Sequence, residues 1–314
     1  MSTSSYLCSS TLPIVSPRSS VLGSGDKTML DESVKCPVTD CILPVDIVLR
    51  SSDQVLIGAH QANLAQFSEG FPTPSDVKAT DDPVDLTEDS LTLRLLVHFT
   101  HKQRYPNLSI TGTPVGTIFS LAEAAEKYLV YSAMVACNMR IDDSYVVELD
   151  PASALVYGVK FNYPGVANRA ALWALTRRSV DDVVKAFGAG YESYSLSWVR
   201  YRETFLSLMG TMTRGSNSYF KYKGTFSSCT DEHWRLFYIS VLADLPLTPG
   251  RFLSTLIDKG TPRDFLTTII QNHRSYIEGG RVCGQCRKRM NNWSAEFSAE
   301  LTAIKPFDTF LPLC

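Results

Sequence analysis

The stretch from residue 46 to residue 71 constrains the fold more than any other part of the chain. It begins D-I-V-L-R-S-S-D-Q-V-L-I-G-A-H and continues with spaced apolar residues to Phe71. The apolar segments at 47–50 and 54–58 flank a short polar turn, which is typical of a β-hairpin. His60 then opens a segment with helical periodicity. The sequence therefore predicts a hairpin that leads directly into a helix.

The elements after this hairpin can also be located from the sequence. Residues 83–86 predict a short strand, and the polar run 87–90 supplies side-chain oxygens for the start of a helix over 91–99. Apolar residues recur at helical spacing over 118–128 and again over 131–141. The short break between these two segments predicts an antiparallel helix pair.

The order and spacing of these elements over about 44–141 resemble the BTB/POZ domain. The run L-A-E-A-A-E-K-Y at 121–128 is most similar to the subgroup found in fungi. The resemblance implies an α+β fold, with a BTB/POZ-like domain at 40–142 that binds other proteins and commonly forms homodimers. Residues that it implies for fold or dimer contacts are Asp46, Ile47, Leu49, His60 and Leu64, and those that it implies near a partner surface are His98, Phe99 and His101.

The regions on either side of this domain differ in composition. Residues 1–35 are rich in Ser with interspersed Pro and Gly, which predicts a disordered tail, and we expect order to begin near Pro44. From residue 150 to 314 only helical segments are visible, so an all-α C-terminal region is predicted. Its first two predicted helices, 151–160 and 166–178, resemble the helix pair that follows many BTB domains.

This helix pair implies one version of an adaptor function, a substrate receptor for a cullin-type ubiquitin ligase. The alternative is a transcription-linked or structural scaffold, which would depend on basic and aromatic segments such as 219–223 and 287–289. Fold analogy alone does not separate the two.

The charge of the chain does not indicate a partner, and it argues against nucleic acid as one. The formal net charge of −2 provides no general attraction to nucleic acid or to anionic membranes. Every apolar run ends well before the ~18 residues that a membrane span needs. The N-terminus has no basic start and no continuous apolar segment, so a secretory signal is not expected. We expect an intracellular protein, cytoplasmic or nuclear, with sparse cysteines that remain thiols or bind metal.

Two cysteine motifs suggest a metal site in the C-terminal half. Cys229 and His233 have C-x-x-x-H spacing, and Cys283 and Cys286 have C-x-x-C spacing. Together they offer four N/S ligands, the number for a closed structural zinc site. The alternative is that Cys229 is a buried thiol, His233 is exposed and the C-x-x-C is incidental. We therefore treat structural zinc as a candidate cofactor, and no other cofactor is indicated.

An enzymatic function has little support in the sequence. Asp46 and His60 can be read as an acid–imidazole pair, but no nucleophile motif accompanies them, and local structural contacts explain both residues better. His233 lacks the second histidine of H-E-x-x-H, and G-x-S-x-G, G-x-G-x-x-G and P-loop patterns do not occur. A zinc- or thiol-dependent enzyme remains the third alternative, after the two adaptor functions, and we predict a protein without enzymatic activity.

Overall fold

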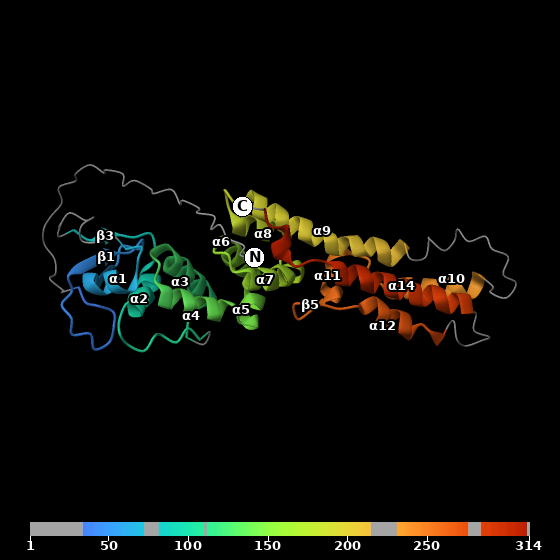
Figure 1. Ribbon diagram of the computed structural model, residues 1–314, viewed down its shortest axis with the longest axis horizontal. Coiled ribbons are helices and arrows are strands. Elements are labelled where there is room, and N and C mark those ends of the chain that lie inside the picture. Colours follow the sequence, from blue (N-terminus) through green and yellow to red (C-terminus); the bar gives the residue numbers. More distant parts are fainter. Residues whose placement is uncertain (1–33, 72–81, 110–111, 215–230, 276–283, 313–314) are drawn as a thin grey trace, which may run out of the picture.

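The computed structural model is an elongated α+β molecule with its sheet at one end (Figure 1). It describes residues 34–71, 82–109, 112–214, 231–275 and 284–312. The helices up to residue 214 follow one another along the long axis, away from the sheet, and those of residues 231–272 and 284–303 lie alongside the last of them. The buried apolar side chains of the described residues form one connected core. The predicted α+β class is therefore confirmed.

The predicted hairpin is present at the start of the sheet. Strand β1 (Ile47–Arg50) pairs antiparallel with β2 (Leu56–Ala59), so that Val48 lies opposite Gly58. The second strand begins two residues later than predicted, because Gln54 adopts a φ of 63° and belongs to the turn. Strand β3 (Val84–Asp85) lies parallel to β1, giving the order β2-β1-β3. Strand β2 is thus an edge of this sheet.

Four helices complete the N-terminal unit, and all four were predicted, the first by its start and the other three by bounds within a few residues. They are α1 (Gln61–Phe67), α2 (Ser90–Phe99), α3 (Val115–Tyr128) and α4 (Tyr131–Ile141). Asp89 caps α2 by accepting a 2.8 Å hydrogen bond from the backbone N–H of Thr92. Helix α3 packs against both α2 and α4, so the two helices expected to pair are in contact.

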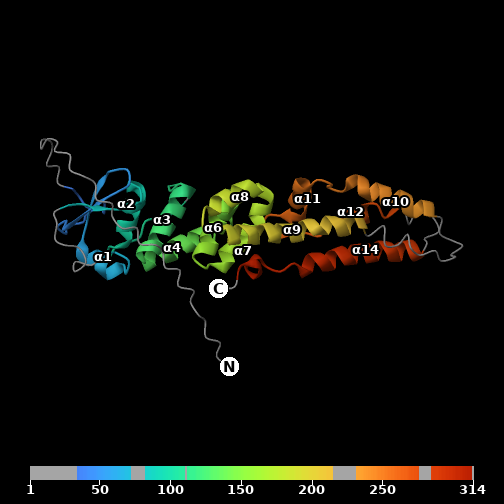
Figure 2. The same ribbon diagram turned by 90° about the horizontal axis from the view of Figure 1, so that it is seen from above.

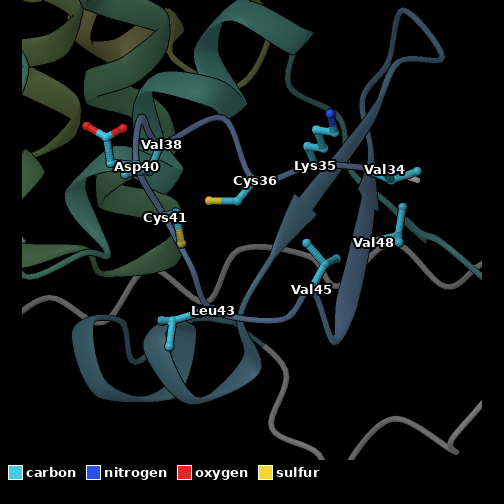
Figure 3. A pocket seen from close by; sticks show the side chains of 9 residues that line it. All are labelled: Val34, Lys35, Cys36, Val38, Asp40, Cys41, Leu43, Val45 and Val48. Carbon is cyan, nitrogen blue, oxygen red and sulfur yellow. The ribbon is translucent and has the colours of Figure 1, made fainter. Parts of the chain in front are cut away.

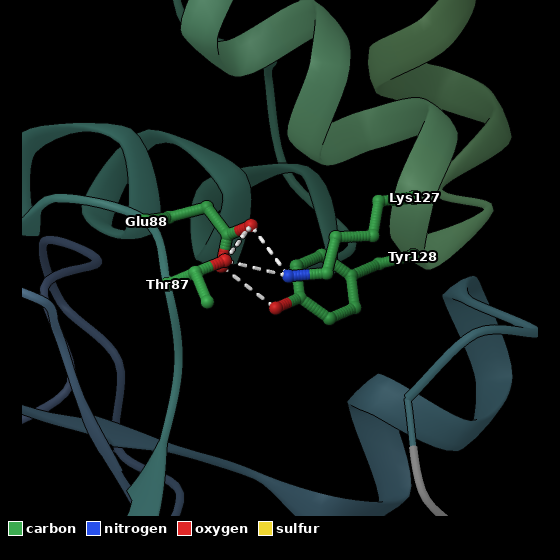
Figure 4. A network of polar contacts seen from close by, with 4 residues as sticks. All are labelled: Thr87, Glu88, Lys127 and Tyr128. Atoms are coloured by element: carbon green, nitrogen blue, oxygen red, sulfur yellow. Dashed lines mark hydrogen bonds and ion pairs between the residues drawn. The ribbon is translucent and has the colours of Figure 1, made fainter. Parts of the chain in front are cut away.

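A polar network fastens the start of α2 to the end of α3 (Figure 4). Lys127 Nζ lies 2.8 Å from Glu88 Oε1, and the Tyr128 hydroxyl donates to Glu88 Oε2 over 2.7 Å. Burial alone would raise the pKa of Glu88, but the hydrogen bonds from Lys127 and Tyr128 outweigh it and lower this pKa. The carboxylate is therefore a charged structural contact between the two helices.

The helix pair predicted after this unit is confirmed. A short helix that was not predicted, α5 (Ser144–Leu149), precedes α6 (Pro151–Lys160) and α7 (Pro164–Arg177). Helices α6 and α7 pack tightly together because Gly158 has no side chain: a Cβ there would lie 2.6 Å from the backbone nitrogen of Ala167. Pro151 and Pro164 each occupy the first turn, where a missing N–H costs no hydrogen bond.

The rest of the chain is mostly helical and is organised around the long helix α9 (Figure 2). Helix α9 packs against α8, α11, α14 and the final 3₁₀ turn, η2. The bounds of these elements are α8 (Val180–Phe187), α9 (Glu192–Arg214), α10 (Asp231–Asp244), α11 (Pro249–Leu256), α12 (Phe265–Asn272), α14 (Gly284–Ala303) and η2 (Phe307–Phe310).

The prediction that the C-terminal region is entirely helical is wrong at one place. Strands β4 (Ile257–Asp258) and β5 (Thr261–Pro262) form a small antiparallel hairpin. Its two turn residues, Lys259 and Gly260, have φ values of 49° and 71°. Two consecutive positive φ angles give a tight hairpin turn, which the all-α prediction for this region did not include.

Candidate metal centre

The segment before β1 forms one side of the candidate site. Its Lys35 carbonyl accepts a 3.1 Å hydrogen bond from Gly58 N–H, so the segment covers part of the outer edge of β2. A Cβ on Gly58 would lie 2.9 Å from the Lys35 carbonyl carbon and 3.0 Å from the Cys36 nitrogen. The close approach therefore requires glycine. This segment is placed from residue 34, earlier than the start near Pro44 that we expected.

A turn within this segment brings two thiols to the same side. Asp40 has a φ of 60°, and Cys41 N–H donates to the Val38 carbonyl over 3.3 Å. Val38 is buried and anchors the turn in the core. Cys36 and Cys41 therefore both lie beside the sheet, half-buried, on one short loop (Figure 3).

Two buried histidines come from the ends of different helices. His60 occupies the N-cap position of α1 without capping it through its side chain, and its Nδ1 lies 2.9 Å from the Pro44 carbonyl oxygen. His101 follows α2, and its Nδ1 lies 2.8 Å from the Val97 carbonyl oxygen. A carbonyl oxygen only accepts, so each Nδ1 carries the proton and each Nε2 keeps its lone pair. These contacts orient both rings as metal-ligating histidines are commonly oriented.

The four side chains converge in one cluster. Cys36 Sγ lies 3.5 Å from His101 Nε2, and Cys41 Sγ lies 3.2 Å from His60 Nε2 and 3.7 Å from His101 Nε2. All four potential ligand atoms lie within 4.8 Å of one another. In a tetrahedral zinc site with Zn–S of about 2.3 Å and Zn–N of about 2.0–2.1 Å, sulfur and nitrogen ligands are about 3.5 Å apart. This group can therefore hold a metal ion.

Burial shifts the pKa of one thiol of the cluster and that of a histidine beside it. Burial raises the pKa of Cys36 to about 11; a backbone hydrogen bond involving Val38 lowers it in part, and the neighbouring Cys41 raises it further. Burial, together with the neighbouring His101, also lowers the pKa of His98, beside the cluster. Burial therefore keeps the Cys36 thiol protonated, and a metal ion that binds this sulfur must displace its proton.

The metal site predicted from the sequence lies largely outside the described residues. Cys229 and Cys283 are not among them, and the structure describes the backbone but not the side chain of His233, in α10. Cys286 is buried in α14. That prediction therefore stays a prediction. The N-terminal cluster had a sequence signal of its own, the C-x-x-x-x-C spacing of Cys36 and Cys41, but we had placed Cys36 next to a segment that we predicted to be disordered and that lies mostly outside the described residues.

Most residues implied for fold or dimer contacts support the fold. Leu49 and Leu64 are buried in the core, and Ile47 is half-buried against it. Asp46 Oδ1 accepts a 2.7 Å hydrogen bond from Gln61 N–H at the start of α1. His60 Nδ1 contacts Pro44, so among the hydrogen bonds of the described residues there is no acid–imidazole pair between Asp46 and His60.

Two of the three residues implied for the partner surface are interior. Phe99 has 0% exposure and His101 has 7%, while His98 is half-buried and its Nδ1 contacts Gln103 Nε2 over 3.1 Å. The implied surface role of Phe99 and His101 is therefore corrected: Phe99 packs in the core of the unit, and His101 belongs to the Cys/His cluster. Helix periodicity did place Phe99 on an apolar face, and that face is turned inward.

Within the described ranges, no helix combines the length and the apolar character needed to cross a bilayer.

Comparisons of the chain with protein-family models, with curated proteins and with solved structures found no match.

Proposed function

We propose that Cys36, Cys41, His60 and His101 bind one Zn²⁺ as a structural site within a BTB/POZ-like protein-interaction module. The observation that carries the proposal is the convergence of two thiols and two Nε2 atoms within 4.8 Å. Soft sulfur and imidazole ligands in a tetrahedral set of four favour zinc among the common metals. Four protein ligands leave no open position for a substrate, which favours a structural over a catalytic role.

The position of the site explains what the metal stabilises. The ligands come from the segment before β1, from the start of α1 and from the end of α2. One ion would connect these three elements in addition to hydrogen bonds such as that between His60 and the Pro44 carbonyl. It would hold residues 34–44 against the edge of β2, where an unpaired strand edge invites association with other chains.

Zinc analysis of the purified full chain tests the metal proposal. We expect Cys41→Ser and His101→Asn each to reduce the bound zinc by one ion per chain. Cys137→Ala, which changes a buried cysteine of α4 outside the cluster, should leave the zinc content unchanged. Unchanged zinc in the two cluster variants would contradict the proposal. Cys283→Ser tests the C-terminal motif separately.

The interaction function is supported by the arrangement of the N-terminal unit, a small sheet with a hairpin that leads into α1 and a helical pair α3–α4. We propose that this unit forms homodimers and acts as an adaptor without catalytic activity. Sedimentation of the full chain over a range of concentrations tests the dimer. A monomer at all concentrations would contradict it.

A cullin-type ubiquitin ligase receptor is the more specific version of this proposal. The observation that favours it is the α6–α7 pair directly after the N-terminal unit, with α6 packed on α3. Binding of the full chain to a purified cullin N-terminal domain, measured by calorimetry, tests this version. If no cullin binds, the transcription-linked or structural scaffold is the alternative that remains.

A further inference from the structure

The two thiols of the cluster border an open cavity, whereas its two imidazoles do not. A cavity of ≈ 690 Å³ is lined by residues 34–48, including Lys35, Cys36, Asp40 and Cys41 (Figure 3). His60 and His101 are not among the lining residues and are only 3% and 7% exposed. A small solute that enters from solvent therefore meets the sulfur atoms first.

The two sulfur atoms are also held close to each other. They lie on one loop with four residues between them, and they are within 4.8 Å of each other. The turn at Asp40 keeps Cys41 folded back toward Cys36 whether or not a metal bridges them. Each histidine is fixed through its Nδ1 to a backbone carbonyl, His60 to Pro44 at the end of the same segment and His101 to Val97 in α2. The sulfur atoms of Cys36 and Cys41 can therefore react with each other without a movement of α1 or α2.

We propose that Cys36 and Cys41 are an oxidation site, at which a peroxide converts the zinc-bound thiolates to a disulfide and releases the ion. This inference rests on the proposed zinc site. One thiolate attacks a peroxide oxygen, so that an S–O bond forms and the O–O bond breaks. The second thiolate then attacks that sulfur, so that the S–S bond forms and the S–O bond breaks. Two thiolates, one H₂O₂ and two protons give one disulfide and two waters, and the sulfurs lose two electrons.

The release of zinc loosens the attachment of the segment before β1. Once the sulfurs bond to each other, neither connects this segment to His60 or His101. The attachments that remain are the backbone hydrogen bond from Gly58 to Lys35, the contact of His60 Nδ1 with the Pro44 carbonyl and the burial of Val38. Lys35 is exposed, so the Lys35–Cys36 bond becomes a better trypsin site when the segment leaves the edge of the sheet.

The experiment adds hydrogen peroxide to the zinc-loaded full chain and records three quantities. These are zinc per chain before oxidation, zinc released during it, and the disulfides found by peptide mapping. We expect the loss of one zinc ion per chain, a Cys36–Cys41 crosslink, faster cleavage after Lys35, and full reversal by a dithiol and added zinc. Cys137→Ala should respond like the unchanged protein.

The outcomes separate the two proposals. No zinc before oxidation refutes the proposed metal site and with it this inference. Zinc that is present but retained while peroxide is consumed refutes the oxidation site alone. Zinc release without a Cys36–Cys41 crosslink, through sulfinic acids or through disulfides to other cysteines, also refutes it. Because the unchanged sequence is used, a misfolded variant cannot obscure the result.

Discussion

Gly58→Ala should weaken zinc binding although Gly58 is not a ligand. The added Cβ would lie 2.9 Å from the Lys35 carbonyl carbon, 3.0 Å from the Cys36 nitrogen and 2.7 Å from Val45 Cγ2. The backbone at Lys35 and Cys36 must then retreat by about 0.5 Å to reach ordinary van der Waals contact. This displacement exceeds the tolerance of about 0.2 Å for a zinc–ligand distance. The Cys36 sulfur therefore loses its position.

The expected loss follows from this displacement. Changes that misplace a zinc ligand through its surroundings commonly reduce affinity about 10–100-fold, which is about 1.4–2.7 kcal/mol. The assay is competition for zinc against a chromophoric chelator. Gly116→Ala is the matched control, because a Cβ at Gly116, in α3, meets nothing within 4 Å. If Gly58→Ala binds zinc as tightly as the unchanged protein, the proposed coupling between this segment and the metal is wrong.

Three further predictions concern stability. Removal of zinc by a chelator should lower the melting temperature, and added zinc should restore it, because a ligand of the folded state stabilises it; an unchanged melting curve would contradict a structural ion. Glu88→Gln should cost about 1–3 kcal/mol in urea unfolding, since Lys127 and Tyr128 lose a charged acceptor. The folded state lowers the pKa of Glu88, so the ionised carboxylate contributes to the free energy of unfolding above the unfolded pKa of about 4.3. This contribution is lost as the pH falls through the pKa of Glu88 in the folded state. If the unchanged protein and Glu88→Gln still differ in stability below that pH, this reasoning is wrong. Gly158→Ala should destabilise the α6–α7 packing by about 1–3 kcal/mol, because its Cβ would overlap Ala167; a variant as stable as the unchanged protein in urea would refute the close approach.

Local sequence signals predicted the regular elements well. The hairpin, the short strand and the helices at 151–160 and 166–178 follow from alternation, helical spacing and turn residues before helix starts, all of which act within a few residues. The hairpin at 257–262 was missed because its turn residues, Lys259 and Gly260, look like an ordinary helix break. Its two positive φ angles become visible only in the structure.

The Cys/His cluster could not be assembled from the sequence, because its members are far apart in the chain. Cys36 and His101 are 65 residues apart, and their contact depends on the packing of the first segment against α2. His60 was interpreted as a structural residue on local grounds. His101 was assigned to a partner surface through a resemblance, and its burial corrects that assignment. The sequence shows which residues are cysteines and histidines that could bind a metal, but only the tertiary fold shows which of them lie together.

The most direct test of the central claim is zinc K-edge X-ray absorption on the full chain loaded with one equivalent of zinc. The Cys36, Cys41, His60 and His101 cluster predicts a first shell of two sulfurs at about 2.3 Å and two nitrogens at about 2.0–2.1 Å. A shell of three sulfurs and one nitrogen would instead match Cys229, His233, Cys283 and Cys286. That result, or a shell without sulfur, would contradict the proposed metal centre.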